Sequence, residues 1–168
     1  VLPYTPSEPF ILSGPKIRRF KNKWFLFYIA GEKWILDGNR PEPVYKIKLA
    51  ISSDGKNWRK INKNLISSAL EEDEAQASPD VIYWKNKYHM FFCYRFSKNY
   101  RNNDRGYRIG YAYSNDLINL LNIQQIKFKL YQHKPLISVK EAKSVQALIF
   151  PSNRYSVHIK NLYLRDKK

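Results

Sequence analysis

Short runs of apolar residues alternating with polar ones, separated by compact polar segments, predict that this chain is built from β-strands. In the clearest example, residues 80–84 and 88–96 are rich in β-branched and aromatic side chains, and Lys85-Asn86-Lys87 between them has the composition of a tight turn. A polar segment at 97–106 then leads into a third run at 107–114. The pattern predicts a strand, a turn, a strand, a loop and a third strand.

The same order of elements occurs earlier in the chain, and the two copies align. Strands are expected at 15–20, 24–30, 45–52 and 58–61. The first two match their later counterparts at an offset of 64 residues, and the third matches at an offset of 62. The change of offset falls in a predicted long loop at 31–44. Repeats of this size made of short strands are typical of β-propeller blades.

The repeat sets the predicted domain organisation. Residues 1–120 are expected to form two propeller-type blades of four antiparallel strands, at about 10–65 and 74–120. The repeat is not recognisable in 121–168, so this segment is interpreted as a basic tail that either closes the fold or is foreign to it. The predicted fold class is all-β, with about two blades of a five-bladed β-propeller and an irregular C-terminal tail.

The composition fits the all-β class and argues against several kinds of function. Aromatic residues make up 15% of the chain, which suits packed sheets. No apolar run approaches the roughly 20 residues that a membrane span needs. Since no signal peptide is visible and the single Cys93 excludes an internal disulfide, the cytoplasm is the favoured location. The three histidines stand far apart and there is no cysteine pair, so neither a metal site nor a cofactor is expected.

The formal net charge of +16 raises the alternative of a polyanion partner. The charge is spread along the chain, because residues 1–120 carry 20 basic and 12 acidic side chains and 121–168 carry 10 and 2. Most of the basic residues are lysines beside Asn and Ile, a bias that an AT-rich coding sequence also produces. Nucleic acid is therefore not the favoured partner, and a basic nucleic-acid-binding module stays as an alternative that would act through the tail.

Carboxylates, guanidinium groups and aromatic rings are predicted to gather at one end of the two sheets. In an antiparallel blade, the start of the first strand, the end of the second and the start of the third lie at the same end. Aromatic rings that stack on sugar faces, beside carboxylates and guanidinium groups, suit a polyhydroxylated ligand. The candidates are Trp34, Asp37, Arg40, Glu74, Asp80, Tyr94, Arg95, Asp104 and Arg105.

At these motifs the chain resembles the five-bladed propellers of the arabinanase, levansucrase and invertase superfamily of glycoside hydrolases. The resemblance covers about residues 8–120 and rests on paired segments in the two copies. These are the openings at 13–17 and 78–81, the hairpin strands at 23–28 and 87–92, and the endings at 50–55 and 112–117. It implies a carbohydrate partner and cleavage or transfer of glycosyl groups by acids at the starts of the inner strands.

The chain departs from that family where its acids would stand, because Ser13 and Ser78 occupy the two positions. Asp80 lies two residues after Ser78 and would point to the same side of a regular strand. The resemblance therefore implies Asp80 as one catalytic acid, with Glu74 as the other. The substrate-binding residues would be Trp34, Asp37, Arg40, Tyr94, Arg95 and Arg105.

Two functions follow from this interpretation. The first is a carbohydrate-active protein, a glycosidase or glycoside phosphorylase, that acts on or binds a glycan at the channel-mouth face of the propeller. The second is a non-catalytic glycan-binding protein or an inactive, truncated remnant, because two acids of the family pattern are replaced and five blades would need roughly 300 residues. Exposed blade edges are also expected to favour a homo-oligomer.

Overall fold

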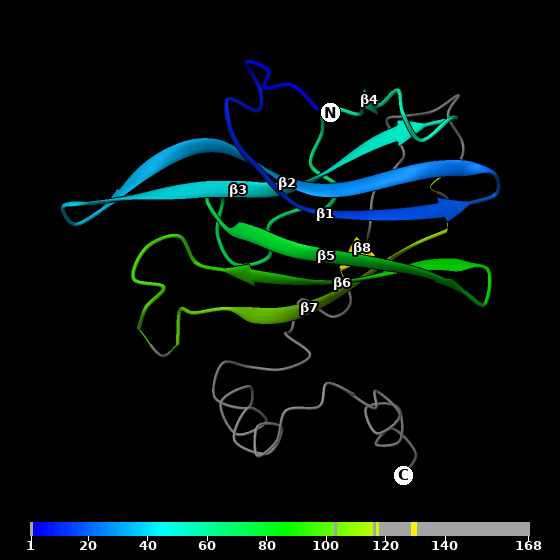
Figure 1. The fold of residues 1–168 in the computed structure, drawn as a ribbon. Coiled ribbons are helices and arrows are strands. Elements are labelled where there is room, and N and C mark those ends of the chain that lie inside the picture. The colour runs from blue at the N-terminus through cyan, green and yellow to red at the C-terminus, as the bar shows by residue number, and fades with distance from the viewer. Residues whose placement is uncertain (1, 103, 116, 118–128, 131–168) are drawn as a thin grey trace, which may run out of the picture.

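The structure is a computed structural model that describes residues 2–102, 104–115, 117 and 129–130. Regular structure in this part of the chain consists of strands alone, in two antiparallel sheets with the orders β1-β2-β3-β4 and β5-β6-β7-β8 (Figure 1). The predicted all-β class and the four-stranded blades are confirmed. The first sheet comprises β1 (Phe10–Phe20), β2 (Lys23–Asp37), β3 (Arg40–Ser52) and β4 (Arg59–Lys60), and the second comprises β5 (Ala75–Trp84), β6 (Lys87–Arg95), β7 (Arg108–Ser114) and β8 (Lys129–Leu130).

The repeat seen in the sequence extends to the backbone conformation. Lys21-Asn22 and Lys85-Asn86 form the two-residue turns β1–β2 and β5–β6, and all four residues have positive φ, between 44° and 62°. Two consecutive positive φ values are the mark of the type I′ turn, whose twist matches that of the flanking strands. Both hairpins therefore use the same turn.

The predicted loop at 31–44 was wrong, because this segment forms an extended arm of the first sheet. β2 and β3 stay paired as far as Asp37 and Arg40, and Gly38, with φ of 63°, helps to close the two-residue turn. Pro41 and Pro43 argued against a strand in the sequence. They are tolerated because each arm strand has a partner on one side only, so a missing N–H is no loss on the open side.

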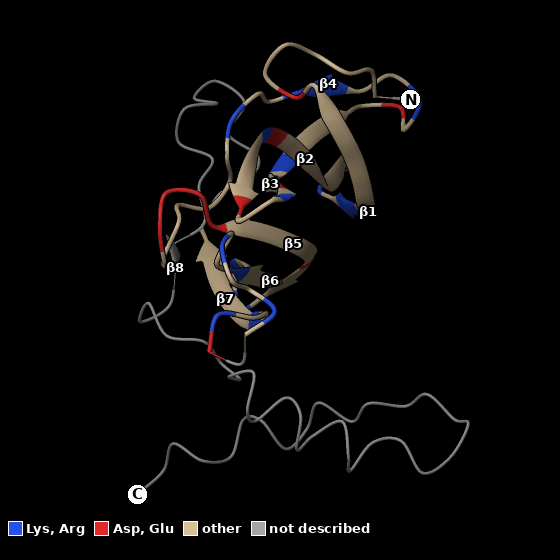
Figure 2. Ribbon diagram, turned by 90° about the vertical axis from the view of Figure 1, so that its left-hand side faces the viewer, with Lys and Arg blue, Asp and Glu red and all other residues tan. Residues whose placement is uncertain are grey.

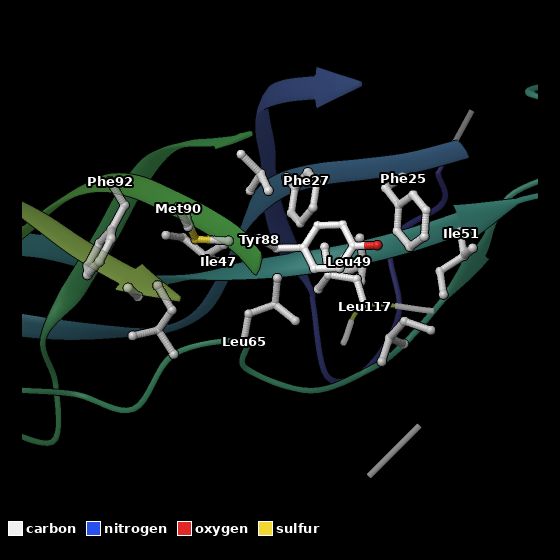
Figure 3. Packing of buried hydrophobic residues seen from close by; sticks show 14 of the residues in the cluster. Phe25, Phe27, Ile47, Leu49, Ile51, Leu65, Tyr88, Met90, Phe92 and Leu117 are labelled. Carbon is white, nitrogen blue, oxygen red and sulfur yellow. The ribbon is translucent and has the colours of Figure 1, made fainter. Parts of the chain in front are cut away.

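The two sheets pack face to face through a shared apolar core (Figure 3). Phe25 and Phe27 of β2 and Leu49 of β3 are fully buried on the first sheet. Met90 and Phe92 of β6 are equally buried on the second, since alternate residues of an antiparallel strand face the same side. Leu65, Ile66 and Leu117 complete this core from outside the strands.

The other face of the first sheet is covered by residues 2–9, which we call the N-terminal cap. Leu2 packs against a small apolar cluster that includes Leu26 and Tyr28. Glu8 is completely buried; it accepts a hydrogen bond from the Tyr28 hydroxyl at 3.1 Å and forms an ion pair with Lys60 Nζ at 2.5 Å. Burial and the Glu8 carboxylate together raise the pKa of Tyr28. The cap is thus fixed by buried polar contacts as well as by apolar packing.

A short part of the predicted tail takes a place in the second sheet. β8 pairs with Ala112 and Tyr113 as β4 pairs with Ala50 and Ile51, which are the same positions of the repeat. Residues 129–130 therefore stand where the fourth strand of a blade belongs. The rest of the segment expected as a tail lies outside the described residues.

Candidate functional site

Asp80 lies at the junction of the two sheets, on the first strand of the second one. Its carboxylate forms an ion pair with the guanidinium of Arg18 on β1, and Arg18 Nε also donates to the Val81 carbonyl at 3.1 Å. The Arg18 and Asp80 side chains are 36% and 44% exposed, so the pair is open to solvent. The structure thus provides an accessible carboxylate whose negative charge is compensated by a fixed arginine.

A β-bulge precedes Asp80 and changes the argument that placed it. The register of β5 with β6 shifts between Ala77 and Asp80, and Ser78 has a φ of 51°. β1 carries the same irregularity between Ser13 and Lys16, with Gly14 at a φ of 60°. An extra residue in a bulge interrupts the alternation of side chains. The inference that Asp80 points to the same side as Ser78 because strands alternate therefore does not hold at this step.

Glu74 is buried at the start of the second sheet and its carboxylate is fully engaged. Oε2 accepts hydrogen bonds from the Ala69 and Leu70 amides at 2.8 and 2.9 Å, and Oε1 accepts one from Gln76 Nε2 at 2.9 Å. Lys46 Nζ, also buried, donates to the Glu74 carbonyl at 2.6 Å, and burial lowers the pKa of this lysine. Residues 61–74, called the linker below, connect β4 to β5. These contacts hold the linker against the start of β5.

Arg95 is enclosed by Tyr45 of β3 and by two tyrosines of the segment between β6 and β7. Its guanidinium carbon lies 3.6 Å from the Tyr100 ring centroid and 5.4 and 5.6 Å from those of Tyr45 and Tyr107. Tyr45 and Tyr107, which occupy equivalent positions of the repeat, share a hydrogen bond of 2.5 Å between their hydroxyls. Burial, followed by this contact, raises the pKa of Tyr45 to about 12. Arg95 is 2% exposed, so it joins the two sheets and does not face solvent.

The loop at 97–106 is held by polar contacts to both the linker and the arm. Arg105 pairs with Glu71 at 3.1 Å, and the Ser97 amide donates to the same carboxylate at 2.7 Å. Asp37, at the tip of the arm, accepts from the Asn99 amide at 2.9 Å. Figure 2 shows the acidic stretch that leads into β5 close to the basic residues of this region. Further ion pairs at this end join Lys33 with Asp73 and Glu42 with Arg101.

The structure separates the predicted ligand residues into buried and exposed groups. Tyr94 is 2% exposed and packs beside Phe92 in the core. Trp34 is 54% exposed on the arm and its ring stacks on Phe10, with centroids 5.0 Å apart, and Arg40 is exposed at the arm's tip. Asp37, Glu74, Arg95 and Arg105 lie at one end, where several of them join the sheets, whereas Asp80 pairs with Arg18 nearer the β1–β2 turn. The tyrosines around Arg95 were missed, although the repeat already paired Tyr45 with Tyr107.

Neither a metal-binding cluster nor a membrane-spanning helix is found among the described residues. They contain no group of three or more His, Cys, Asp and Glu side chains that could hold a metal ion. Nor does this part of the chain include a helix long and apolar enough to cross a membrane.

Solved structures similar to this chain are propellers of glycoside hydrolases. A family 117 glycoside hydrolase of the marine bacterium Zobellia galactanivorans superposes with a TM-score of 0.60 at 18% identity, over 81% of this chain and 36% of that one. A putative glycosidase from Bacteroides thetaiotaomicron gives 0.54 at 18% identity, over 77% and 34%. A β-xylosidase gives 0.51 at 17% identity, over 77% and 37%. No family model and no curated protein matches the sequence.

These likenesses define the class of the fold. The chain is an all-β protein with the blade architecture of propeller-type glycoside hydrolases. It spans about a third of the length of the solved structures that it matches.

Proposed function

We propose that this chain is a glycoside-hydrolase-like, carbohydrate-active protein that binds a glycan at the channel-mouth face of the blades, with Asp80 as the central contact. The observation that carries the proposal is the accessible Asp80 carboxylate, held by Arg18 on the first strands of two blades with this fold. A carboxylate fixed by a guanidinium group can accept hydrogen bonds from sugar hydroxyls without moving.

The exposed part of the arm would contact a different sugar unit of an oligosaccharide, because Trp34 lies nine residues along β2 from Phe25, the register partner of Arg18, or about 30 Å at 3.3 Å per residue. Trp34 offers a broad ring that is backed by Phe10 and therefore held in one orientation. Such a preorganised aromatic surface suits the apolar face of a sugar ring. Arg40, at the arm's tip, would donate hydrogen bonds to hydroxyls. Tyr94 and Arg95 would shape the site from below without touching the ligand, which their burial supports.

Catalysis within this proposal depends on a second carboxylate. Glycosidases place two carboxyl groups roughly 5–9.5 Å apart. Glu74 lies six residues before Asp80, and at about 3.3 Å per residue their Cα atoms are on the order of 20 Å apart, somewhat less for the bulge. The hydrogen bonds of Glu74 support a structural role for it. We therefore propose glycan binding for this chain by itself, with cleavage requiring an acid supplied by further blades.

The test is a thermal-shift and calorimetric series with arabino-, xylo-, galacto- and fructo-oligosaccharides. Binding to the native state raises Tm, so at least one sugar series should raise it. Trp34→Ala and Asp80→Asn should each weaken that binding about tenfold or more, equal to about 1.4 kcal/mol. Tyr4→Ala, which removes another exposed aromatic ring, from the N-terminal cap, is the matched control and should bind normally.

Two results would contradict the proposal. One is the absence of a Tm shift with every sugar at millimolar concentration. The other is a shift that only short oligonucleotides produce and that disappears at high salt, which is the behaviour of a basic nucleic-acid-binding module.

A further inference from the structure

We propose that the end of the two blades formed by the β1–β2 and β5–β6 turns is a binding surface for an anionic polysaccharide, one that carries sulfate or carboxylate groups. The choice of a glycan rests on the function proposed above, and the surface is separate from the Asp80 site. It is called the basic turn surface below. Its members are the basic side chains at and beside the two type I′ turns: Arg19, Lys21, Lys23, Lys85 and Lys87.

The packing of the sheets brings the two turns together. Phe20, which precedes the first turn, has its ring centroid 5.2 Å from that of Tyr88 and 6.5 Å from that of Tyr83, on either side of the second turn. Both turns lie at the same end of the sheets (Figure 1). Lysines that stand 64 residues apart in the sequence therefore belong to one surface.

The charge of this surface is not neutralised by the residues that the structure describes. None of the five basic side chains forms an ion pair with them, whereas acids and bases are paired at the opposite end. The acids of neighbouring segments are already engaged. Asp80 pairs with Arg18, and Asp54 accepts hydrogen bonds from the Lys56 and Asn57 amides at 2.9 and 2.8 Å. Clustered cations without counter-charges attract a polyanion.

The remainder of the sequence adds to this charge. Residues 121–168 carry 10 basic and 2 acidic side chains, so they bring net positive charge and not a counter-charge. A neighbouring blade leaves such lysines accessible, as the first blade shows: Lys21 is exposed and Lys23 half-buried, although the second sheet is packed against the first. Lys85 and Lys87, at the equivalent positions, are both exposed. The positive surface therefore belongs to the blade ends and not to an uncovered sheet face.

The aromatic rings beside the turns favour a glycan over a single-stranded nucleic acid. Single strands are held by bases that stack on open aromatic rings. Here cations lie over the rings, with the Arg19 guanidinium 5.3 Å from the centroid of Trp24 and Lys85 Nζ 4.4 Å from that of Trp84. This leaves less ring surface for bases. The same contacts hold the cations in place, where sulfate or carboxylate groups can pair with them.

The test is titration of the full chain with chondroitin sulfate, polygalacturonate and neutral dextran at two salt concentrations, followed by tryptophan fluorescence. At least one anionic polymer should bind and should weaken with salt, whereas dextran should show no such dependence. Lys21→Gln combined with Lys85→Gln should raise the dissociation constant of that polymer about tenfold or more at low salt. Lys33→Gln combined with Lys98→Gln, which removes two exposed lysines from the other end, is the matched control and should bind like the parent chain.

Three results would overturn the proposal. The first is binding of both anionic polymers no tighter than that of dextran. The second is an equal loss in both double variants, which indicates attraction by net charge alone. The third is tighter binding of a single-stranded oligonucleotide that the turn substitutions weaken, which would assign the surface to nucleic acid.

The neutral oligosaccharides of the thermal-shift series separate this surface from the Asp80 site. If they raise Tm while the anionic polymers fail to bind, the basic turn surface is wrong and the Asp80 site stands. If only the anionic polymers bind, and the turn substitutions weaken them, the Asp80 site is wrong and the basic turn surface stands.

Discussion

At the scale of single residues, the most informative side chains are the buried charged ones. Glu8, Glu74 and Arg95 are each at most 2% exposed, and each has hydrogen-bond partners on another segment of the chain. Glu8 holds the cap, Glu74 holds the linker and Arg95 holds the tyrosines around it. A buried charge with its partner removed is strongly destabilising, so these residues are expected to matter most for folding.

Replacing Glu74 separates a structural role from a catalytic one. Glu74→Ala would leave the half-buried Ala69 and Leu70 amides without their acceptor, and should lower the free energy of unfolding by about 1–3 kcal/mol. Urea denaturation measures this change. Glu72→Ala, which removes an exposed carboxylate two residues away, is the control and should have little effect. If Glu74→Ala kept full stability while abolishing turnover of a sugar, the structural role would be wrong.

Tyr45 makes stability sensitive to alkaline pH. Its pKa is raised from 10.0 to about 12, mainly by burial, so an unfolded chain ionises this tyrosine before the folded one does. The stability it contributes is therefore complete below pH 10 and is lost as the pH rises from about 10 to 12. Denaturation at successive pH values should show this decline. Tyr45→Phe should make it shallower, although the raised pKa values of Tyr28 and Tyr94 act in the same direction. An identical decline in that variant would contradict the assignment.

The residue scale is where prediction from the sequence was weakest. Charge and aromatic character correctly placed Arg95, Glu74 and Asp37 at one end of the sheets. They could not distinguish an arginine that faces a ligand from one enclosed by tyrosines, because that depends on how two sheets far apart in the sequence approach each other. Whether the named residues bind or cleave a glycan stays a prediction.

At the scale of elements, the two β-hairpins show how a short sequence fixes its own turn. Lys85-Asn86 adopts positive φ at both positions, a conformation in which Gly is less strained than any residue with a Cβ. The strands on either side were predictable, because alternating apolar residues and the repeat indicated the same boundaries. The arm was missed because its prolines argue against a strand. Its turn, Gly38-Asn39, is nevertheless a hairpin signal.

A pair of glycine substitutions tests the turn conformation. Asn86→Gly should raise the free energy of unfolding by about 0.5–1 kcal/mol, since glycine takes up the positive φ without strain. Asn39→Gly places the same change in the arm's turn, where Asn39 is not among the residues with positive φ, and should be neutral or destabilising. Thermal melts of both variants measure the difference. Equal effects would argue against a type I′ turn at Lys85-Asn86.

At the scale of the whole molecule, the two sheets should behave as one cooperative unit. The core between them is formed by both, with Phe27 and Leu49 on one side and Met90 and Phe92 on the other. Neither sheet can keep that face buried without the other. The repeat predicted two blades, and the packing of one against the next is the reason to expect a single folding unit.

A core truncation tests this cooperativity. Phe27→Ala should lower the free energy of unfolding by about 3–5 kcal/mol, and both sheets should still melt together. Coincident transitions by circular dichroism and by tryptophan fluorescence would show this, because Trp84 lies in the second sheet and the other tryptophans lie in or beside the first. Leu36→Ala, at a position 66% exposed on the arm, is the control and should change stability by less than about 0.5 kcal/mol. Two separate transitions in the parent chain would contradict a single unit.

The N-terminal cap also means that, during synthesis, one face of the first sheet can be covered before the other. Because the cap precedes the first sheet in the chain, it can cover the face with Leu26 and Tyr28 as soon as β4 has left the ribosome. The other face of that sheet, with Phe25 and Phe27, stays open until β7 is made. At roughly 5–20 residues per second, the roughly 60 residues between the ends of β3 and β7 take about 3–12 s. For those seconds the nascent chain displays an apolar sheet on one side only, which makes it a substrate for chaperones before it is a folded protein.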